Sequence, residues 1–131
     1  MQEDPIVIVG AARTPMGGFQ GSLSAVSAPE LGGVAIKSAL ERAGVPAQDV
    51  AEVIMGLCLF AGVRQAPARQ AAHNAGVPWS SGATTISKMC GSAMKSAMLA
   101  HDNILAGSAE VMIAGGMESM TNAPYILPKA R

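Results

Sequence analysis

Continuous apolar runs alternate along this chain with stretches in which apolar residues recur every three or four positions. The first pattern is typical of buried strands and the second of amphipathic helices. The apolar runs predict four strands, over 6–12, 50–59, 84–89 and 111–116. The helical patterns predict three helices, over 28–43, 67–75 and 91–106. Strands separated by helices favour an α/β layered fold with a largely parallel sheet and helices packed on it.

The first strand and the first helix give clear local signals. The run over 6–12 is rich in β-branched residues and predicts a strand that is buried on both faces. Ser27 and Glu30 form a capping-box pattern at the start of the first helix. Gly44 fits the left-handed position that follows the last helical residue.

Cys90 lies where the third predicted strand meets the third predicted helix. The N–H groups of a first helical turn lack partners, and together with the helix dipole they favour an anion. Cysteines at helix N-termini therefore ionise more readily, and the small residues Gly91, Ser92 and Ala93 leave room for a bulky partner. This pattern predicts a nucleophilic cysteine that becomes acylated. The alternative is a buried cysteine that acts as a small hydrophobic residue, the interpretation we give to Cys58 inside its apolar run.

The remaining titratable candidates have simpler interpretations. His73 and His101 fall within predicted helices, and we expect them to be surface or packing residues rather than bases for Cys90. Glu118 follows the fourth strand and two glycines, so we expect it to anchor a loop by hydrogen bonding. Because chemistry in parallel sheets gathers at the carboxyl ends of strands, Cys90 and Glu118 are expected to lie near each other.

The composition fits one domain and argues against several functions. The chain has 131 residues, 50% of them hydrophobic, and its formal net charge is zero. With no basic run and only 3% aromatic residues, nucleic acid is not an expected partner. No stretch has the length of a membrane span, and no secretory signal pattern precedes the first strand. The two cysteines form neither a metal nor a disulfide pattern, so we expect no metal and a reducing compartment, the cytoplasm.

Four stretches of the chain resemble the thiolase family, in the family's order. These stretches are 8–15, 65–72, 88–95 and 114–120. The Cys-Gly-Ser sequence at Cys90 is more similar to acetyl-CoA C-acetyltransferases than to degradative 3-ketoacyl-CoA thiolases. The resemblance implies the N-terminal half of a five-layered αβαβα architecture. Residues 1–120 are then expected to form its N-terminal α/β domain, and 121–131 to begin a loop region that is truncated or nicked.

The resemblance also implies a reaction. Cys90 is then the acyl acceptor, which takes the acetyl group from acetyl-CoA. A second acetyl-CoA, deprotonated at its methyl carbon, attacks the acetyl-cysteine to give acetoacetyl-CoA, and the reverse reaction is thiolysis. This is ping-pong covalent catalysis, in which the Cys90 N–H helps to hold the thioester oxygen. The implied substrate is a coenzyme A thioester, with no covalently bound cofactor, and the implied assembly is a homo-oligomer, a dimer or tetramer.

Some family features differ or are missing in this chain. Around the cysteine, Ser87 stands where Asn is common in the family, and Ala93 stands where Gly is common. The family's catalytic Gly-His-Pro and Cys-x-Gly motifs do not occur. Because catalytic units fail when a member is removed, we expect activity only with a C-terminal part, present as a separate chain. The alternative is a non-catalytic thiolase-fold fragment or interaction module.

Overall fold

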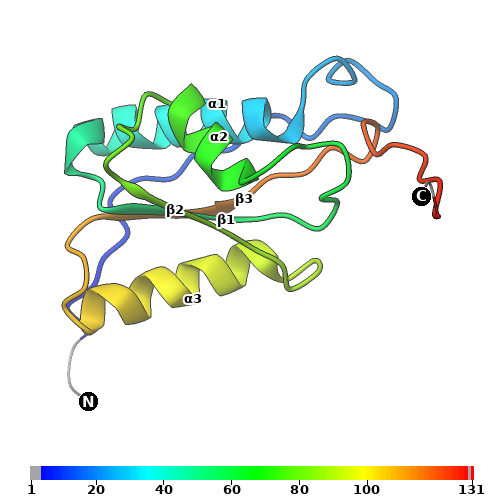
Figure 1. Cartoon of the computed structure of the whole chain (residues 1–131). Coiled ribbons are helices and arrows are strands. Elements are labelled where there is room, and N and C mark those ends of the chain that lie inside the picture. Colours follow the sequence, from blue (N-terminus) through cyan, green and yellow to red (C-terminus); the bar gives the residue numbers. More distant parts are fainter. Residues whose placement is uncertain (1–3, 130) are drawn as a thin grey trace.

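A three-stranded parallel sheet lies between two layers of helices (Figure 1). The computed structural model describes residues 4–129 and 131. Its strands are β1 (Glu52–Gly56), β2 (Gly82–Ile86) and β3 (Met112–Gly116), arranged in the order β2-β1-β3. The helices α1 (Ala28–Ala43) and α2 (Pro67–Asn74) cover one face of the sheet, and α3 (Ser92–Leu105) covers the other. The expected α/β fold with a parallel sheet and packed helices is therefore confirmed.

The three strands pair in register along their whole length. Gly56, the last residue of β1, lies opposite Ile86 of β2 and Gly116 of β3. The carboxyl ends of all three strands therefore meet at one edge, and the loops that follow them start side by side. In open α/β sheets this is the edge at which ligand sites form.

The main hydrophobic core lies between the sheet and the layer formed by α1 and α2. Its buried members include Ile36, Leu40, Val53, Met55, Leu57, Ala68, Ala71, Ala72 and Met117. Burying one large apolar side chain of this kind contributes about 1.5–3 kcal/mol. The first helix approaches this core closely at Gly32, where an added Cβ would lie 2.7 Å from the sulfur of Met117.

The predicted helix boundaries are confirmed to within one or two residues. At the start of α1, the Glu30 N–H donates to the Ser27 hydroxyl at 3.4 Å, and the Ser27 N–H donates to the Glu30 carboxylate at 2.8 Å. Gly44 ends this helix with a φ of 66°, in the left-handed region that glycine adopts without strain. In the described part of the chain, no helix has both the length and the apolar character needed to cross a membrane.

Three of the predicted strands exist, with narrower or shifted bounds. The run over 50–59 extends beyond β1 at both ends, although Val50 and Leu57 remain buried. The run over 84–89 also passes the end of β2, because the chain turns after Ile86 toward α3. Apolar character persists where a chain is buried, whereas a strand ends where its ladder partner ends.

The prediction of a buried strand over 6–12 is wrong. This segment lies outside the sheet, and Val7, Ile8 and Val9 are 73%, 90% and 63% exposed. It packs on α1 instead: a Cβ added at Gly10 would lie 2.8 Å from the Ala39 carbonyl oxygen, and the Arg42 guanidinium donates to the Ala11 carbonyl at 2.9 Å. A β-branched run becomes a strand only where a neighbouring backbone offers donors and acceptors, and no described segment does so here.

On the other face of the sheet, α3 begins directly against the glycine ends of two strands. A Cβ added at Gly56 would lie 2.5 Å from the Cβ of Ser92, and one added at Gly116 would lie 2.8 Å from the Cβ of Ala93. Real Cβ atoms do not approach this closely, so the missing side chains at both positions are what allow the first turn of α3 to lie where it does.

An ionic contact ties the start of the described chain to α3. His101 Nε2 lies 2.9 Å from Asp4 Oδ2, and His101 Nδ1 lies 3.2 Å from Asp102 Oδ1. Hydrogen bonds to Asp102 and then to Asp4 raise the pKa of His101 above 6.5. The backbone N–H of Ile6, followed by His101, lowers the pKa of Asp4 below 3.8.

We predict that replacing Gly56 by Ala destabilises the fold by about 1–3 kcal/mol, because the added methyl overlaps the first turn of α3. Chemical denaturation measures the free energy of unfolding. The matched control is Gly18→Ala, since an added Cβ at Gly18 meets no atom within 4 Å. Equal stabilities of the two variants would contradict the predicted overlap.

We also predict that the contact between Asp4 and His101 depends on pH in two directions. The His101 contribution is fully present below its ordinary pKa and is lost as pH rises through the raised value. The Asp4 contribution is present above its ordinary pKa and is lost as pH falls through the lowered value. The contact is therefore strongest between about pH 4 and 6.5.

An NMR titration of the His101 ring tests this pH dependence. Asp4→Asn should lower the pKa of His101, whereas Glu41→Gln, which removes an exposed carboxylate from α1 on the other face of the sheet, should leave it unchanged. An unaltered His101 titration in Asp4→Asn would show that the contact does not form.

Candidate active site

A sharp turn between β2 and α3 presents Cys90 at the carboxyl edge of the sheet. Within the segment 87–91, which we call the elbow, Met89 has a φ of 48°, in the left-handed region. The Gly91 N–H donates to the Lys88 carbonyl at 3.1 Å, and the Ser92 N–H donates to the Met89 carbonyl at 3.1 Å. Cys90 is exposed on this elbow. The interpretation of Cys90 as a buried small hydrophobic residue is therefore wrong.

The N-terminus of α3 presents unpaired donors at the elbow. Within the described residues, the N–H groups of Cys90, Ala93 and Met94 donate to no protein acceptor. Such donors, aligned with the helix dipole, favour negative charge nearby. The predicted placement of Cys90 at a strand-to-helix junction, beside the positive end of a helix, is confirmed.

Ser92 holds the elbow from inside. Its hydroxyl accepts the Lys88 N–H at 2.7 Å and donates to the Met89 carbonyl at 2.6 Å, and the residue is only 4% exposed. From the sequence we considered Ser92 only as a small residue that leaves room beside Cys90, and we did not predict these hydrogen bonds. A serine in a first helical turn is a familiar partner for backbone groups, so the residue type carried a signal for this role.

Glu118 joins the loops that follow β1 and β3. Its carboxylate accepts the Cys58 N–H at 2.9 Å and the Leu59 N–H at 3.1 Å. Just before it, the Met117 N–H donates to the Gly56 carbonyl at 3.0 Å. The expectation that Glu118 anchors a loop by hydrogen bonding is confirmed, and the anchored loop is the one after β1.

Cys58 is half-buried beside this anchor and is not a member of the main core. Its pKa is raised, chiefly by burial and then by the hydrogen bond and charge of Glu118, with a smaller contribution from Cys90. The nearby Ser92 hydroxyl acts in the opposite direction. The environments of the two thiols therefore differ, since Cys58 faces a carboxylate and Cys90 faces the N-terminus of a helix.

Neither histidine is placed to act on Cys90. His101 lies nine residues along α3 from Ser92, which is roughly 14 Å of helix. His73 belongs to α2, on the opposite face of the sheet, where its ring stacks on Trp79 at 4.3 Å. The interpretation of both histidines as surface or packing residues agrees with these positions.

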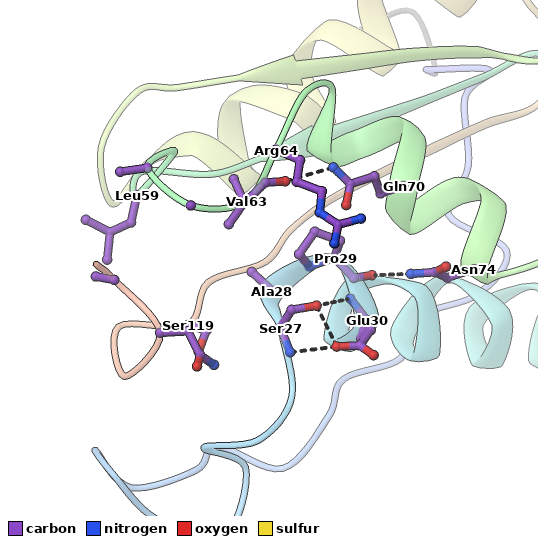
Figure 2. A pocket seen from close by; sticks show the side chains of 14 residues that line it. Ser27, Ala28, Pro29, Glu30, Leu59, Val63, Arg64, Gln70, Asn74 and Ser119 are labelled. Carbon is purple, nitrogen blue, oxygen red and sulfur yellow. Dashed lines mark hydrogen bonds between the residues drawn. The ribbon is translucent and has the colours of Figure 1, made fainter. Parts of the chain in front are cut away.

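A cavity of about 430 Å³ opens at the same edge of the sheet, on the side of α1 and α2 (Figure 2). Cys90 is not among its lining residues. Its amide side chains are occupied by backbone groups: Gln70 donates to the Val63 carbonyl at 2.8 Å, and Asn74 donates to the Pro29 carbonyl at 3.4 Å. We therefore assign the cavity no part in the site around Cys90.

No cluster in the described ranges, 4–129 and 131, brings together three or more His, Cys, Asp or Glu residues that could hold a metal ion. The described part of the site is thus an exposed thiol, a row of backbone donors, and a carboxylate and a hydroxyl that hold the two loops. Such an arrangement can present a nucleophile and bind a developing oxyanion.

Comparison with known proteins identifies the relatives of this chain. A family model described as "Thiolase, N-terminal domain" matches residues 6–131. The acetyl-CoA acetyltransferase of Cupriavidus necator is 57% identical over 126 residues, which make up 96% of this chain and 32% of that protein. The mitochondrial acetyl-CoA acetyltransferase of Danio rerio is 54% identical over 124 residues, covering 95% of this chain and 30% of that protein.

A cytosolic acetyl-CoA acetyltransferase of Gibberella zeae is 51% identical over 127 residues, covering 97% of this chain and 32% of that protein. Among solved structures, the Acat5 thiolase from Ascaris suum in complex with coenzyme A matches with a TM-score of 0.92 at 38% identity, covering 95% of this chain and 32% of that one. The chain thus spans about a third of the length of these relatives. By its sequence and its fold, the chain belongs to the thiolase family, whose N-terminal domain it matches.

Proposed function

We propose that this domain supplies the nucleophile of an acetyl-CoA C-acetyltransferase and that Cys90 is the acyl acceptor. The observation that carries the proposal is the exposure of Cys90 on the elbow, beside the unpaired N–H groups at the start of α3. The names of the relatives support the choice of acetyl-CoA as substrate. Residues 1–120 form the N-terminal α/β domain in this proposal, and 121–131 begin a loop region.

The proposed reaction has two halves. In the first, the Cys90 thiolate attacks the carbonyl carbon of acetyl-CoA, the thioester bond breaks, and coenzyme A leaves as its thiolate. In the second, a base removes a proton from the methyl group of another acetyl-CoA. The resulting carbanion attacks the acetyl carbon, which gives acetoacetyl-CoA and frees Cys90. The N–H of Cys90 is suited to hold the thioester oxygen as it gains negative charge.

The second half needs a base that this chain does not bring to Cys90. His101 and His73 lie elsewhere, and Glu118 is engaged by two backbone N–H groups. A thioester α-proton is too weakly acidic to leave unaided, so we place the base on polypeptide outside these 131 residues.

An unpartnered apolar stripe on α3 supports packing against further polypeptide. Met94, Met98 and Leu105 are 73%, 54% and 62% exposed and lie along one side of the helix. The proposed partners are the remainder of the thiolase and further copies of the enzyme in a homo-oligomer. The two free thiols fit a reducing compartment, so we propose the cytoplasm, although named relatives include cytosolic and mitochondrial proteins.

The nucleophile is tested in a hybrid protein in which this chain replaces the matching third of the Cupriavidus necator enzyme. After incubation with labelled acetyl-CoA and acid quenching, we predict an acetyl group on the peptide that contains Cys90. Cys90→Ala should lower acetoacetyl-CoA thiolysis roughly a thousandfold or more, because the covalent route is lost. In the Cys58→Ala hybrid, Cys90 should still become acetylated. A label on Cys58, or none on Cys90, would refute the assignment.

The need for outside residues is tested with the isolated chain. We predict that the 131-residue chain alone has less than about a thousandth of the hybrid's thiolysis activity, since the proton-transfer group is missing. Activity close to that of the hybrid would instead place the base on His73, His101 or Glu118. A non-catalytic interaction module would give a third result, a well-folded hybrid in which Cys90 takes no acetyl group.

A further inference from the structure

Glu118 continues the pairing of β1 with β3 beyond the point where the strands end. The last paired residues are Gly56 and Gly116. After them, the carboxylate of Glu118 takes the place of a backbone acceptor and binds the N–H groups of Cys58 and Leu59. Glu118 is 60 positions from Cys58 and 59 positions from Leu59 in the sequence, so these hydrogen bonds form only in the folded protein.

The segment held by Glu118 borders the inner side of the elbow. Cys58 lies beside Ser92, whose hydroxyl is close enough to influence the Cys58 thiol. Two residues before Cys58, Gly56 is in direct contact with the first turn of α3 at Ser92. Ser92 in turn binds Lys88 and Met89, the residues that precede Cys90. A continuous set of contacts therefore runs from Glu118 to the elbow.

The charge of Glu118 is not explained by an ion pair. No Lys, Arg or His in the described part of the chain forms a salt bridge with it. The half-buried carboxylate is instead directed at two N–H groups and a thiol. A neutral amide could accept one of these N–H groups but would place its own donors against the other. The site therefore requires an acceptor with two oxygens, and its charge opposes ionisation of the nearby Cys58.

We propose that Glu118 is a positioning residue of the acyl-transfer site: its carboxylate holds the loop after β1 against Ser92, Ser92 holds the elbow, and of two neighbouring thiols only Cys90 is presented to the thioester. This inference rests on the function proposed above. It assigns Glu118 no contact with the substrate. Its effect on the reaction runs through Cys58, Ser92 and the backbone of the elbow.

The test compares Glu118→Gln, Glu118→Asp and Glu110→Gln in the hybrid protein. Glu110 is an exposed glutamate just before the other end of β3, so its replacement makes the same change of charge away from the site. The rate of iodoacetamide alkylation at pH 8 is measured separately for Cys58 and Cys90 by peptide mass spectrometry. The kcat and KM of thiolysis are measured on the same preparations.

We expect Glu118→Gln to raise the alkylation rate of Cys58 about tenfold, because loss of the carboxylate charge lowers the pKa of that thiol. We expect kcat to fall at least tenfold while KM changes less than about threefold, because the elbow is misplaced but the substrate contacts remain. Glu118→Asp keeps the charge, so its Cys58 alkylation rate and its kcat should lie between those of Glu118→Gln and those of the unmodified hybrid. Glu110→Gln should behave as the unmodified hybrid.

A Glu118→Gln variant with lower thermal stability but unchanged kcat and Cys58 alkylation would overturn the proposal, since Glu118 would then be only a structural residue. If this variant does not fold, Ser92→Ala decides, because it removes the link between the loop and the elbow. An unchanged kcat in Ser92→Ala overturns the proposal, and at least a fivefold loss supports it. If the unmodified hybrid takes no acetyl group, the proposed function fails, while the alkylation rates still test Glu118.

Discussion

The close contact of α3 with the glycine ends of β1 and β3 is the constraint on which the rest of the site depends. Gly56 and Gly116 are paired residues on the neighbouring strands β1 and β3, because the strands of the sheet pair in register. Only a residue without a side chain at these positions lets Ser92 and Ala93 lie directly above them. This contact fixes the start of α3, and therefore the position of the elbow and of the thiol that it carries.

Polar groups at this edge are held by partners from distant parts of the chain. Ser96, which is fully buried, donates to the Gly115 carbonyl at 2.8 Å and so joins α3 to β3. Ser92 and Glu118 hold the elbow and the loop after β1 in the same way. Leaving a buried polar group without a partner costs about 1–3 kcal/mol. Each of these hydrogen bonds therefore stabilises the observed positions of α3, the elbow and the loop over positions in which the bond is broken. In contrast, Cys90 is exposed and makes no such bond.

The features that the sequence could predict are those whose physical cause is local. The capping box of Ser27 and Glu30 and the position of Cys90 ahead of α3 depend on residues within a few positions of one another. The segment 6–12 has the composition of a strand, but its state depends on whether another backbone lies beside it. The role of Glu118 as an anchor was predictable from its place after two glycines. Its partner loop was not, since that loop is about 60 residues away.

The same geometry explains how two cysteines of one domain acquire different chemistry. Cys90 is exposed beside the unpaired N–H groups of a helix N-terminus, whereas the Glu118 carboxylate disfavours negative charge on the sulfur of Cys58. Both environments arise from the edge where β1, β2 and β3 end together. Under the proposed function, this arrangement prepares a nucleophile but supplies no proton acceptor for the condensing acetyl group. In that proposal, the thiol becomes productive only when further polypeptide brings a base to the exposed side of the elbow, and catalysis then depends on the assembly of the whole enzyme.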